Sequence, residues 1–290
     1  MEKKHVILSI NGTFYDMIGE YFYFISEVFP EVKKIAQSHN IELEYRDVAF
    51  STHDEKIYSR DLILRDLNYI DDDRTFFICF RGQRIGWIPT ANDVTKLTLD
   101  EYPELVKHIN GISLTELVIM HALRPFYRVI GGEKHIIQPT RHSLFYFRNS
   151  DYLDDIDDAQ KVCYGNVTSG EIDKEVKDYE IAKAKDLVFD FMREFRKIQG
   201  NPPRVIINHY DVKWREDVEA VDILRDYVDE YVRLNGQLDE DFFEIHKNFL
   251  CKNLKGSLGE FEYEGRPLKD VIINDLINEL RLEFPENFKD

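Results

Sequence analysis

The sequence predicts an α/β fold in which a parallel sheet carries helices on both faces. Three observations lead to this fold class. Short apolar runs typical of buried strands recur at residues 6–10, 74–80 and 142–147. Segments with helical periodicity separate these runs, and turn signals follow most of them. Because such helices serve as crossovers, consecutive strands are expected to lie parallel in one sheet.

The first half of this α/β unit begins with the strand at residues 6–10, which ends in the turn signal Asn11 and Gly12. Asp16 can cap the helix that follows, whose apolar residues recur every three or four positions as far as residue 35. Residues 41–45 alternate like a second strand, residues 51–58 are a polar loop, and a second helix is predicted at about 59–70.

The second half contains the clearest buried strand, residues 74–80, which is broken by Gly82, Gly86 and Pro89. Another helix opens at residues 112–117, and a fourth strand is predicted at 142–147. In sheets of this kind ligands bind beyond the carboxyl ends of the strands. The loops that follow the first and third strands are therefore the expected location of a site.

The remainder of the chain is expected to be mostly helical. Residues 151–158 contain five aspartates but lack the order of a calcium loop, so a solvated linker is predicted there. Beyond it, helices are predicted at 171–198, 217–234, 240–254 and 267–283, with one strand at 204–210. The predicted organisation is an α/β domain at 1–152, an acidic linker at 153–170 and a mostly helical C-terminal region at 171–290.

Composition excludes several classes of protein. The 290 residues are 43% hydrophobic, which argues against disorder, and the formal charge of −17 disfavours nucleic acid and anionic membranes as partners. No apolar run approaches the roughly 18 residues of a membrane span. Cys79, Cys163 and Cys251 are far apart, which argues against a zinc ribbon or a disulfide framework. These features predict a cytoplasmic protein without a metal site.

Two segments could carry chemistry. The loop from Asn11 to Asp16 joins a strand to a helix N-terminus, where backbone N–H groups favour an anion such as phosphate, although Gly12 and Asp16 also fit a simple turn and cap. Ser113 and Glu116 have the spacing of a capping box, in which the glutamate bonds back to the Ser113 N–H. From the residues alone, the cap is the favoured role of Glu116.

Several blocks, taken in order over about residues 5–152, resemble a known family. They look like the TIR-like domain of unknown function found N-terminal to NACHT/STAND ATPases in bacterial defence proteins and in the animal telomerase-associated vault protein. The most specific blocks are the one from Gly82 to Pro89 and the one from Ser113 to Ala122. The other matching residues are Thr13, Phe14, Asp16, Met17, Glu20, Val28, Phe29, Pro30, Asp47, Phe145, Tyr146, Phe147 and Arg148.

The resemblance implies an activity as well as a TIR-like (flavodoxin-like) fold. In TIR enzymes a glutamate that opens the helix after the third strand cleaves the nicotinamide–ribose bond of NAD⁺, and Glu116 is in the corresponding place. A carboxylate there would steady the positive charge of an oxocarbenium-like state. NAD⁺ would be the substrate, and no further cofactor is implied. The substrate-binding residues would be Asn11, Gly12, Thr13, Phe14, Arg81, Arg84 and Trp87.

The resemblance implies partners and also marks departures. TIR enzymes act when self-associated, so the leading hypothesis is an oligomeric NADase (NAD⁺ glycohydrolase) of an antiphage defence system, with a STAND/NACHT ATPase in cis or in trans. Tyr21 and Ala49 stand where the family usually has arginines, which favours altered ligand preference or no catalysis. The competing hypothesis is a non-enzymatic module that self-associates or binds a nucleotide signal. His121 is expected to be structural, because it points to a different helix face from Glu116.

Overall fold

The structure is a computed structural model of the chain. It describes residues 3–13, 16–47, 62–72, 74–84, 88–156, 164, 167–168, 171–172, 204–219 and 255–289. The helices predicted at 171–198, 217–234 and 240–254 fall almost wholly outside these residues, as do Phe14, Ala49 and Trp87.

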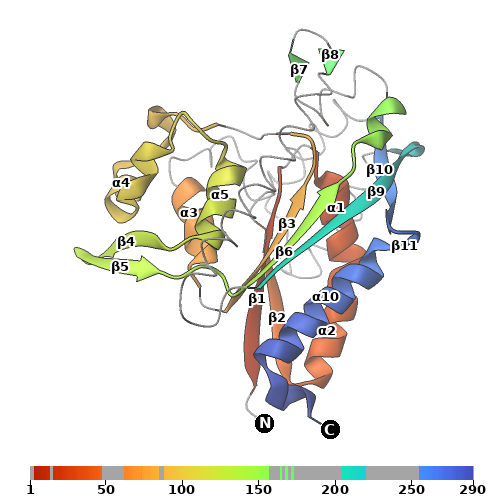
Figure 1. Ribbon diagram of the computed structural model, residues 1–290, viewed down its shortest axis with the longest axis horizontal. Coiled ribbons are helices and arrows are strands. Elements are labelled where there is room, and N and C mark those ends of the chain that lie inside the picture. Colours follow the sequence, from red (N-terminus) through yellow and green to blue (C-terminus); the bar gives the residue numbers. More distant parts are fainter. Residues whose placement is uncertain are drawn as a thin grey trace, which may run out of the picture.

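A seven-stranded, mostly parallel sheet organises the molecule (Figure 1). Its strands, in chain order, are β1 Lys4–Asn11, β2 Ile41–Asp47, β3 Thr75–Arg81, β6 His142–Arg148, β9 Arg204–Glu219, β10 Lys255–Tyr263 and β11 Arg266–Pro267. The parallel strands lie in the order β2-β1-β3-β6-β9, and β10 and β11 extend the sheet beyond β9 as antiparallel strands. The predicted α/β class with a parallel sheet is confirmed.

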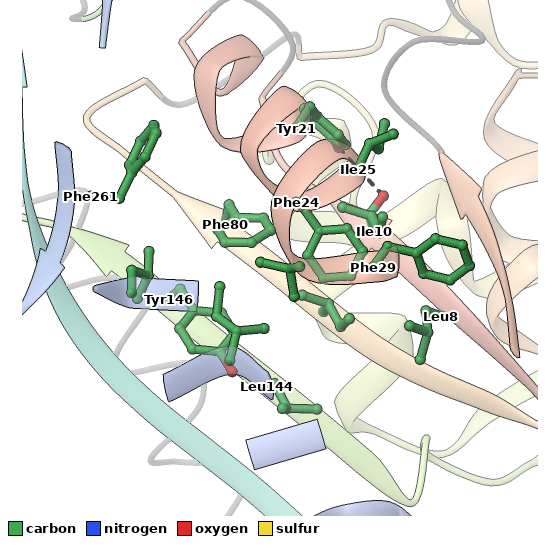
Figure 2. Packing of buried hydrophobic residues seen from close by; sticks show 14 of the residues in the cluster. Leu8, Ile10, Tyr21, Phe24, Ile25, Phe29, Phe80, Leu144, Tyr146 and Phe261 are labelled. Carbon is green, nitrogen blue, oxygen red and sulfur yellow. Dashed lines mark hydrogen bonds between the residues drawn. The ribbon is translucent and has the colours of Figure 1, made fainter. Parts of the chain in front are cut away.

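Helices cover both faces of the sheet. Successive side chains of a strand point to opposite faces, and in β3 both sets are apolar, so both faces need a covering layer. Phe76, Ile78 and Phe80 pack on one face against α1 Ile18–Tyr23, α2 Phe29–Ser38 and α10 Leu268–Glu283. Figure 2 shows Phe80 between Phe24 and Tyr146, with ring centroids 6.1 Å and 5.5 Å away. Phe77 and Cys79 point to the other face, against α5 Leu114–Leu123, with α3 Leu62–Ile70 beside it.

The long helix predicted after Asp16 forms, but it contains one wider turn. The π-helical segment η1 Phe24–Val28 lies between α1 and α2. Pro30 has no N–H, and its ring would clash with the carbonyl of residue 26 in a regular α-helix, which accounts for the widening. Asp16 does not cap the helix as predicted: Met17 is the N-cap residue, and no side chain caps that end.

A lobe that the sequence did not predict is inserted between β3 and β6. It contains the short helices η3 Ala91–Asp93, α4 Lys96–Glu101 and η4 Pro103–Lys107, and the hairpin of β4 Phe126–Ile130 with β5 Glu133–Ile137. In Figure 1 α4 and the hairpin stand apart from the sheet. A third apolar cluster, which includes Leu67, Tyr102 and Phe126, joins the lobe to α3.

The C-terminal region is not mostly helical in the part that the structure describes. The helix predicted at 267–283 is confirmed as α10, but β9 runs well past residue 210, and β10 and β11 are strands. The cause is a period of two: Tyr210, Val212 and Trp214 pack on the core of one face, while charged residues alternate with them. The remaining short elements are η5 Asp151–Asp154 and β7 Val167–Thr168, which precede this region, and β8 Glu171–Ile172 and η6 Pro285–Phe288 within it.

Among the described residues, the search for a helix long and apolar enough to cross a bilayer finds none.

Candidate functional site

A buried ionic cluster lies at the carboxyl edge of the sheet, where the fold class places ligand sites. Its centre is Arg148, the last residue of β6, whose side chain is fully buried. Arg148 Nη1 donates to Glu20 Oε1 at 2.7 Å, and Nη2 donates to Asp16 Oδ2 at 3.1 Å. Tyr210, the neighbour of Arg148 on β9, donates to the same Glu20 oxygen at 2.8 Å. Glu20 on α1 thus binds both Arg148 of β6 and Tyr210 of β9, and Arg148 also binds Asp16 just before the helix.

Neighbouring polar groups hold Arg148 and Asp16 in place. The Arg148 carbonyl accepts from Gln83 Nε2 at 2.8 Å, and Gln83 Oε1 accepts from the Tyr152 hydroxyl at 2.7 Å. The guanidinium also lies over the Tyr152 ring, 4.8 Å from its centroid. Thr13 donates a short hydrogen bond to Asp16. Each ionic group is therefore oriented by a second residue.

Burial governs the electrostatics of the cluster. Loss of water raises the pKa of the Asp16 carboxyl, although the charge of Arg148 and, more weakly, those of Arg84 and Arg81 oppose the shift. Burial also raises the pKa of Glu20 against the charge of Arg148. Burial alone would lower the pKa of Arg148, but the charge of Glu20, followed by those of Tyr152 and Asp16, outweighs it and keeps the guanidinium protonated.

Two atoms of the cluster are buried without a partner. Glu20 Oε2 and Arg148 Nε have no hydrogen-bond partner among the residues that the structure describes. Buried polar atoms are usually paired, and unpaired ones with perturbed ionisation mark candidate functional sites.

Gly82, directly after β3, makes the close approach possible. A Cβ atom at this position would lie 2.4 Å from both Arg148 Nη2 and Asp16 Oδ2. Any side chain at residue 82 would therefore displace the ion pair, which explains why a glycine follows the strand.

Most of the predicted substrate-binding residues gather at this same edge. Asn11 ends β1 and is buried, Gly12 follows it, and Thr13 belongs to the cluster. Arg81 ends β3 and is also buried, rather than lying on the surface, and its charge and that of Arg84 reach Asp16. Phe14 and Trp87, predicted to stack on a planar ring, lie outside the described residues.

Glu116 lies on α5, which packs on the other face of the sheet from α1. Its Oε2 accepts from the Ser113 N–H at 2.9 Å, and its own N–H donates to Ser113 Oγ at 3.2 Å, so the predicted capping box is confirmed. Glu116 is only 2% exposed. The carboxylate is committed to the helix N-terminus, and its predicted catalytic role stays a prediction.

His121, within α5, lies in a buried polar network, and its expected structural role stays a prediction. Its Nε2 lies 2.5 Å from Asp71 Oδ1, and Tyr102 and Arg128 bond to the other Asp71 oxygen at 2.5 Å and 3.0 Å. Among the described residues, no group of three or more His, Cys, Asp and Glu side chains is arranged to hold a metal ion.

Sequence reasoning does not predict the ion pairs of this cluster. It predicts a cap for Asp16 and substrate binding for Thr13, and Glu20 and Arg148 enter only through the family resemblance. The four-residue spacing of Asp16 and Glu20 was an available signal, because it places two carboxylates on one side of a helix start. Tyr210 and Gln83 gave no local signal, since long-range pairing alone brings them to the site.

Comparisons with known proteins give a distant match to part of the chain. No family model and no solved structure matches. The chain is similar to telomerase protein component 1 of Mus musculus, with 27% identity over 161 residues, and to the same protein of Rattus norvegicus, with 25% identity. Each match covers 54% of this chain and only 6% of the relative.

Proposed function

We propose that this chain is a non-enzymatic TIR-like module that self-associates as part of a STAND-type defence protein, with the ATPase in cis or in trans. The observation that carries the proposal is the position of Glu116. Its carboxylate accepts from the Ser113 N–H and is 2% exposed. To reach a ribose it would have to leave the cap, at a cost of about 1 kcal/mol, and also leave its buried surroundings.

The ionic cluster supports a structural role for the carboxyl edge. Both terminal nitrogens of Arg148 already donate hydrogen bonds to Asp16 and Glu20. A nucleotide phosphate that needed this guanidinium would have to displace two internal carboxylates. The cluster is therefore better suited to fixing the strand ends rigidly than to exchanging a ligand.

The similarity to telomerase protein component 1 supports a role within an assembly. The name describes a component of a larger complex, and the matching segment is a small fraction of those long chains. We propose that the present chain likewise works through association rather than as an isolated unit.

Sedimentation equilibrium of the full chain over a wide concentration range tests this proposal. The module is expected to show reversible self-association, strengthened by an inert crowding agent. A chain that remains monomeric at every concentration, with and without crowding, would overturn the proposal.

The second candidate is the NAD⁺ glycohydrolase of an antiphage system, and one specific observation favours it. Two carboxyls with raised pKa values, Asp16 and Glu20, lie beside arginines at the edge where parallel sheets bind ligands. In this candidate Glu116 leaves its cap on assembly and stabilises the sugar cation, while Arg81 or Arg84 binds the diphosphate. It requires nicotinamide release that is lost in Glu116→Gln.

A further inference from the structure

The β4–β5 hairpin is a separate two-stranded ribbon. Gly131 and Gly132 form its turn with φ values of 60° and 86°, as a two-residue hairpin turn of type I′ requires. Among the described strands β5 pairs only with β4, and four of its five residues are exposed. A two-stranded ribbon is marginally stable in water unless something covers or extends it.

One face of the hairpin is used within the molecule. Phe126 packs into the apolar cluster with α3. Arg128, two residues further on, donates to Asp71 at 3.0 Å and to Glu101 at 2.8 Å. Because residues two apart point to the same side of a strand, this is the inner face.

The opposite face carries Tyr127, Val129 and Ile136 together with Lys134. The cross-strand pair of Tyr127 with Ile136 and that of Val129 with Lys134 lie on it. Ile136 is 57% exposed, and Lys134 Nζ lies 3.6 Å from the centroid of the Tyr127 ring. The outer face thus offers apolar surface next to the edge of β5 that pairs with none of the described strands.

The lobe that carries the hairpin has no net charge. Residues 88–141 contain six basic and six acidic side chains, so the formal charge of −17 belongs to the rest of the chain. Two copies repel each other over most of their surfaces, and this lobe is where approach meets the least repulsion. Five of the six exposed large apolar side chains of the described residues also lie in this lobe: Ile88, Leu97, Val106, Ile130 and Ile136.

From these observations we propose that β5 pairs with β5 of a second copy, edge to edge and antiparallel, so that two hairpins form one four-stranded sheet. The proposal rests on the self-association stated above and names its surface. An unpaired strand edge is complementary to another extended strand, and the same edge on an identical chain gives a closed twofold dimer.

The pairing register follows from strand length. Full overlap of a five-residue antiparallel strand with its own copy places the central residue, His135, opposite itself. Ile136 then lies opposite Lys134 of the second copy, and the two Ile136 side chains become diagonal neighbours on the apolar face. This register makes a direct prediction for cross-linking.

Cysteine cross-linking tests the register. Directly opposite residues have Cα atoms about 4.5–5.5 Å apart, within disulfide range. Under mild oxidation His135→Cys is expected to form a covalent dimer that the wild type does not form. Leu97→Cys, at another exposed position of the same lobe, is the control for random collision. Equal cross-linking of the two variants, or none in His135→Cys, would overturn the register.

Sedimentation of the full chain tests the surface itself. Ile136→Lys adds a charge to the dimer face and is expected to raise the dissociation constant at least tenfold. Val106→Lys, at a 62% exposed position of the same lobe, should leave it unchanged. If Ile136→Lys associates like the wild type, the surface is wrong while the proposed self-association stands. A wild-type chain that stays monomeric would overturn both.

Discussion

The sheet carries one ionic cluster at the amino ends of its parallel strands, the amino edge, and another at their carboxyl ends, the carboxyl edge. Strand β6 begins in the first cluster and ends in the second. At the amino edge His142 Nδ1 lies 2.6 Å from Glu279 Oε2, and its Nε2 lies 2.9 Å from Glu283 Oε2. Arg204 Nε adds a bond to Glu279 at 2.7 Å. Both glutamates come from α10, so this cluster joins α10 to the first residues of β6 and β9.

The net pKa shifts of the carboxyl groups in the two clusters have opposite signs. Burial would raise the pKa of Glu279, but the hydrogen bonds and charges of His142 and Arg204 outweigh it, and that pKa lies below its ordinary value. At the carboxyl edge burial prevails, and the pKa values of Asp16 and Glu20 are raised. At the amino edge the partners of Glu279 therefore outweigh its desolvation, whereas at the carboxyl edge desolvation of Asp16 and Glu20 outweighs the charge of Arg148.

The sharpest way to test this contrast is to remove one arginine from each edge. Arg148→Met leaves two buried carboxylates without their main partner and is expected to cost about 3–5 kcal/mol. Arg204→Met removes a half-exposed side chain, while Glu279 keeps His142, so a loss of about 1 kcal/mol or less is expected. Urea unfolding measures the loss of free energy of unfolding in each variant. Equal losses in the two variants would contradict the difference between the two clusters.

The pH dependence of stability should differ in sign between the edges. The contribution of Glu279 to the free energy of unfolding is complete above its pKa in the unfolded chain, about 4.3. It is lost as the pH falls through the lower pKa of the folded state. The contribution of Asp16 to the free energy of unfolding is complete below its pKa in the unfolded chain, about 3.9. It is lost as the pH rises through the higher pKa of the folded state.

Unfolding of matched amide variants between pH 3 and pH 8 would check these signs. Glu279→Gln should cost about 1.5–3 kcal/mol at neutral pH, with the gap to the wild type narrowing on acidification. The difference in the free energy of unfolding between the wild type and Asp16→Asn should instead become smaller as the pH rises. Parallel profiles for the two variants would refute the assignment of opposite signs.

A smaller effect is expected from crowding the carboxyl edge without changing its charge. Gly82→Ala places a methyl group against Arg148 and Asp16, and should destabilise the fold by about 1–3 kcal/mol. Gly111→Ala is the matched control, because its added Cβ would meet only the His108 carbonyl, at 3.4 Å. Thermal unfolding of both variants measures these losses. If Gly82→Ala is as stable as the wild type, the cluster is loosely packed and the prediction is wrong.

The smallest effect separates the cap from the charge at α5. Ser113→Ala removes the side chain that accepts from the Glu116 N–H and should cost about 1 kcal/mol. Glu116→Gln keeps the capping geometry, since glutamine also serves in a capping box, and should cost only a few tenths of a kcal/mol. Chemical unfolding compares the free energies of unfolding of the two variants, and a larger loss for Glu116→Gln than for Ser113→Ala would contradict the cap as the main role of this carboxylate.

Much of the central fold could be predicted because its signals are local. The buried runs that became β1, β3 and β6, the capping box at Ser113 and the start of α10 are all visible in short windows of sequence. Each depends on periodicity, or on a single turn of backbone, so the chain specifies it without long-range information.

The elements that were missed depend on distant partners. The hairpin strand β5 contains Glu133, Lys134 and His135, a polar run that no strand pattern predicts, and its partner β4 provides the pairing. The charged residues that alternate along β9 beyond residue 210 concealed the strand in the same way. At the site, Arg148 reaches carboxylates more than 120 residues away in sequence, which no local motif encodes.

The account depends on Glu116 serving as a cap and not as a catalyst, and nicotinamide release is the direct measure. The full chain, its Glu116→Gln variant and its Ser113→Ala variant would be incubated with NAD⁺ under crowding, at concentrations where sedimentation shows self-association. We expect the dinucleotide to remain intact in all three. Release by the wild type and by Ser113→Ala that disappears in Glu116→Gln would contradict the account and establish the carboxylate as catalytic.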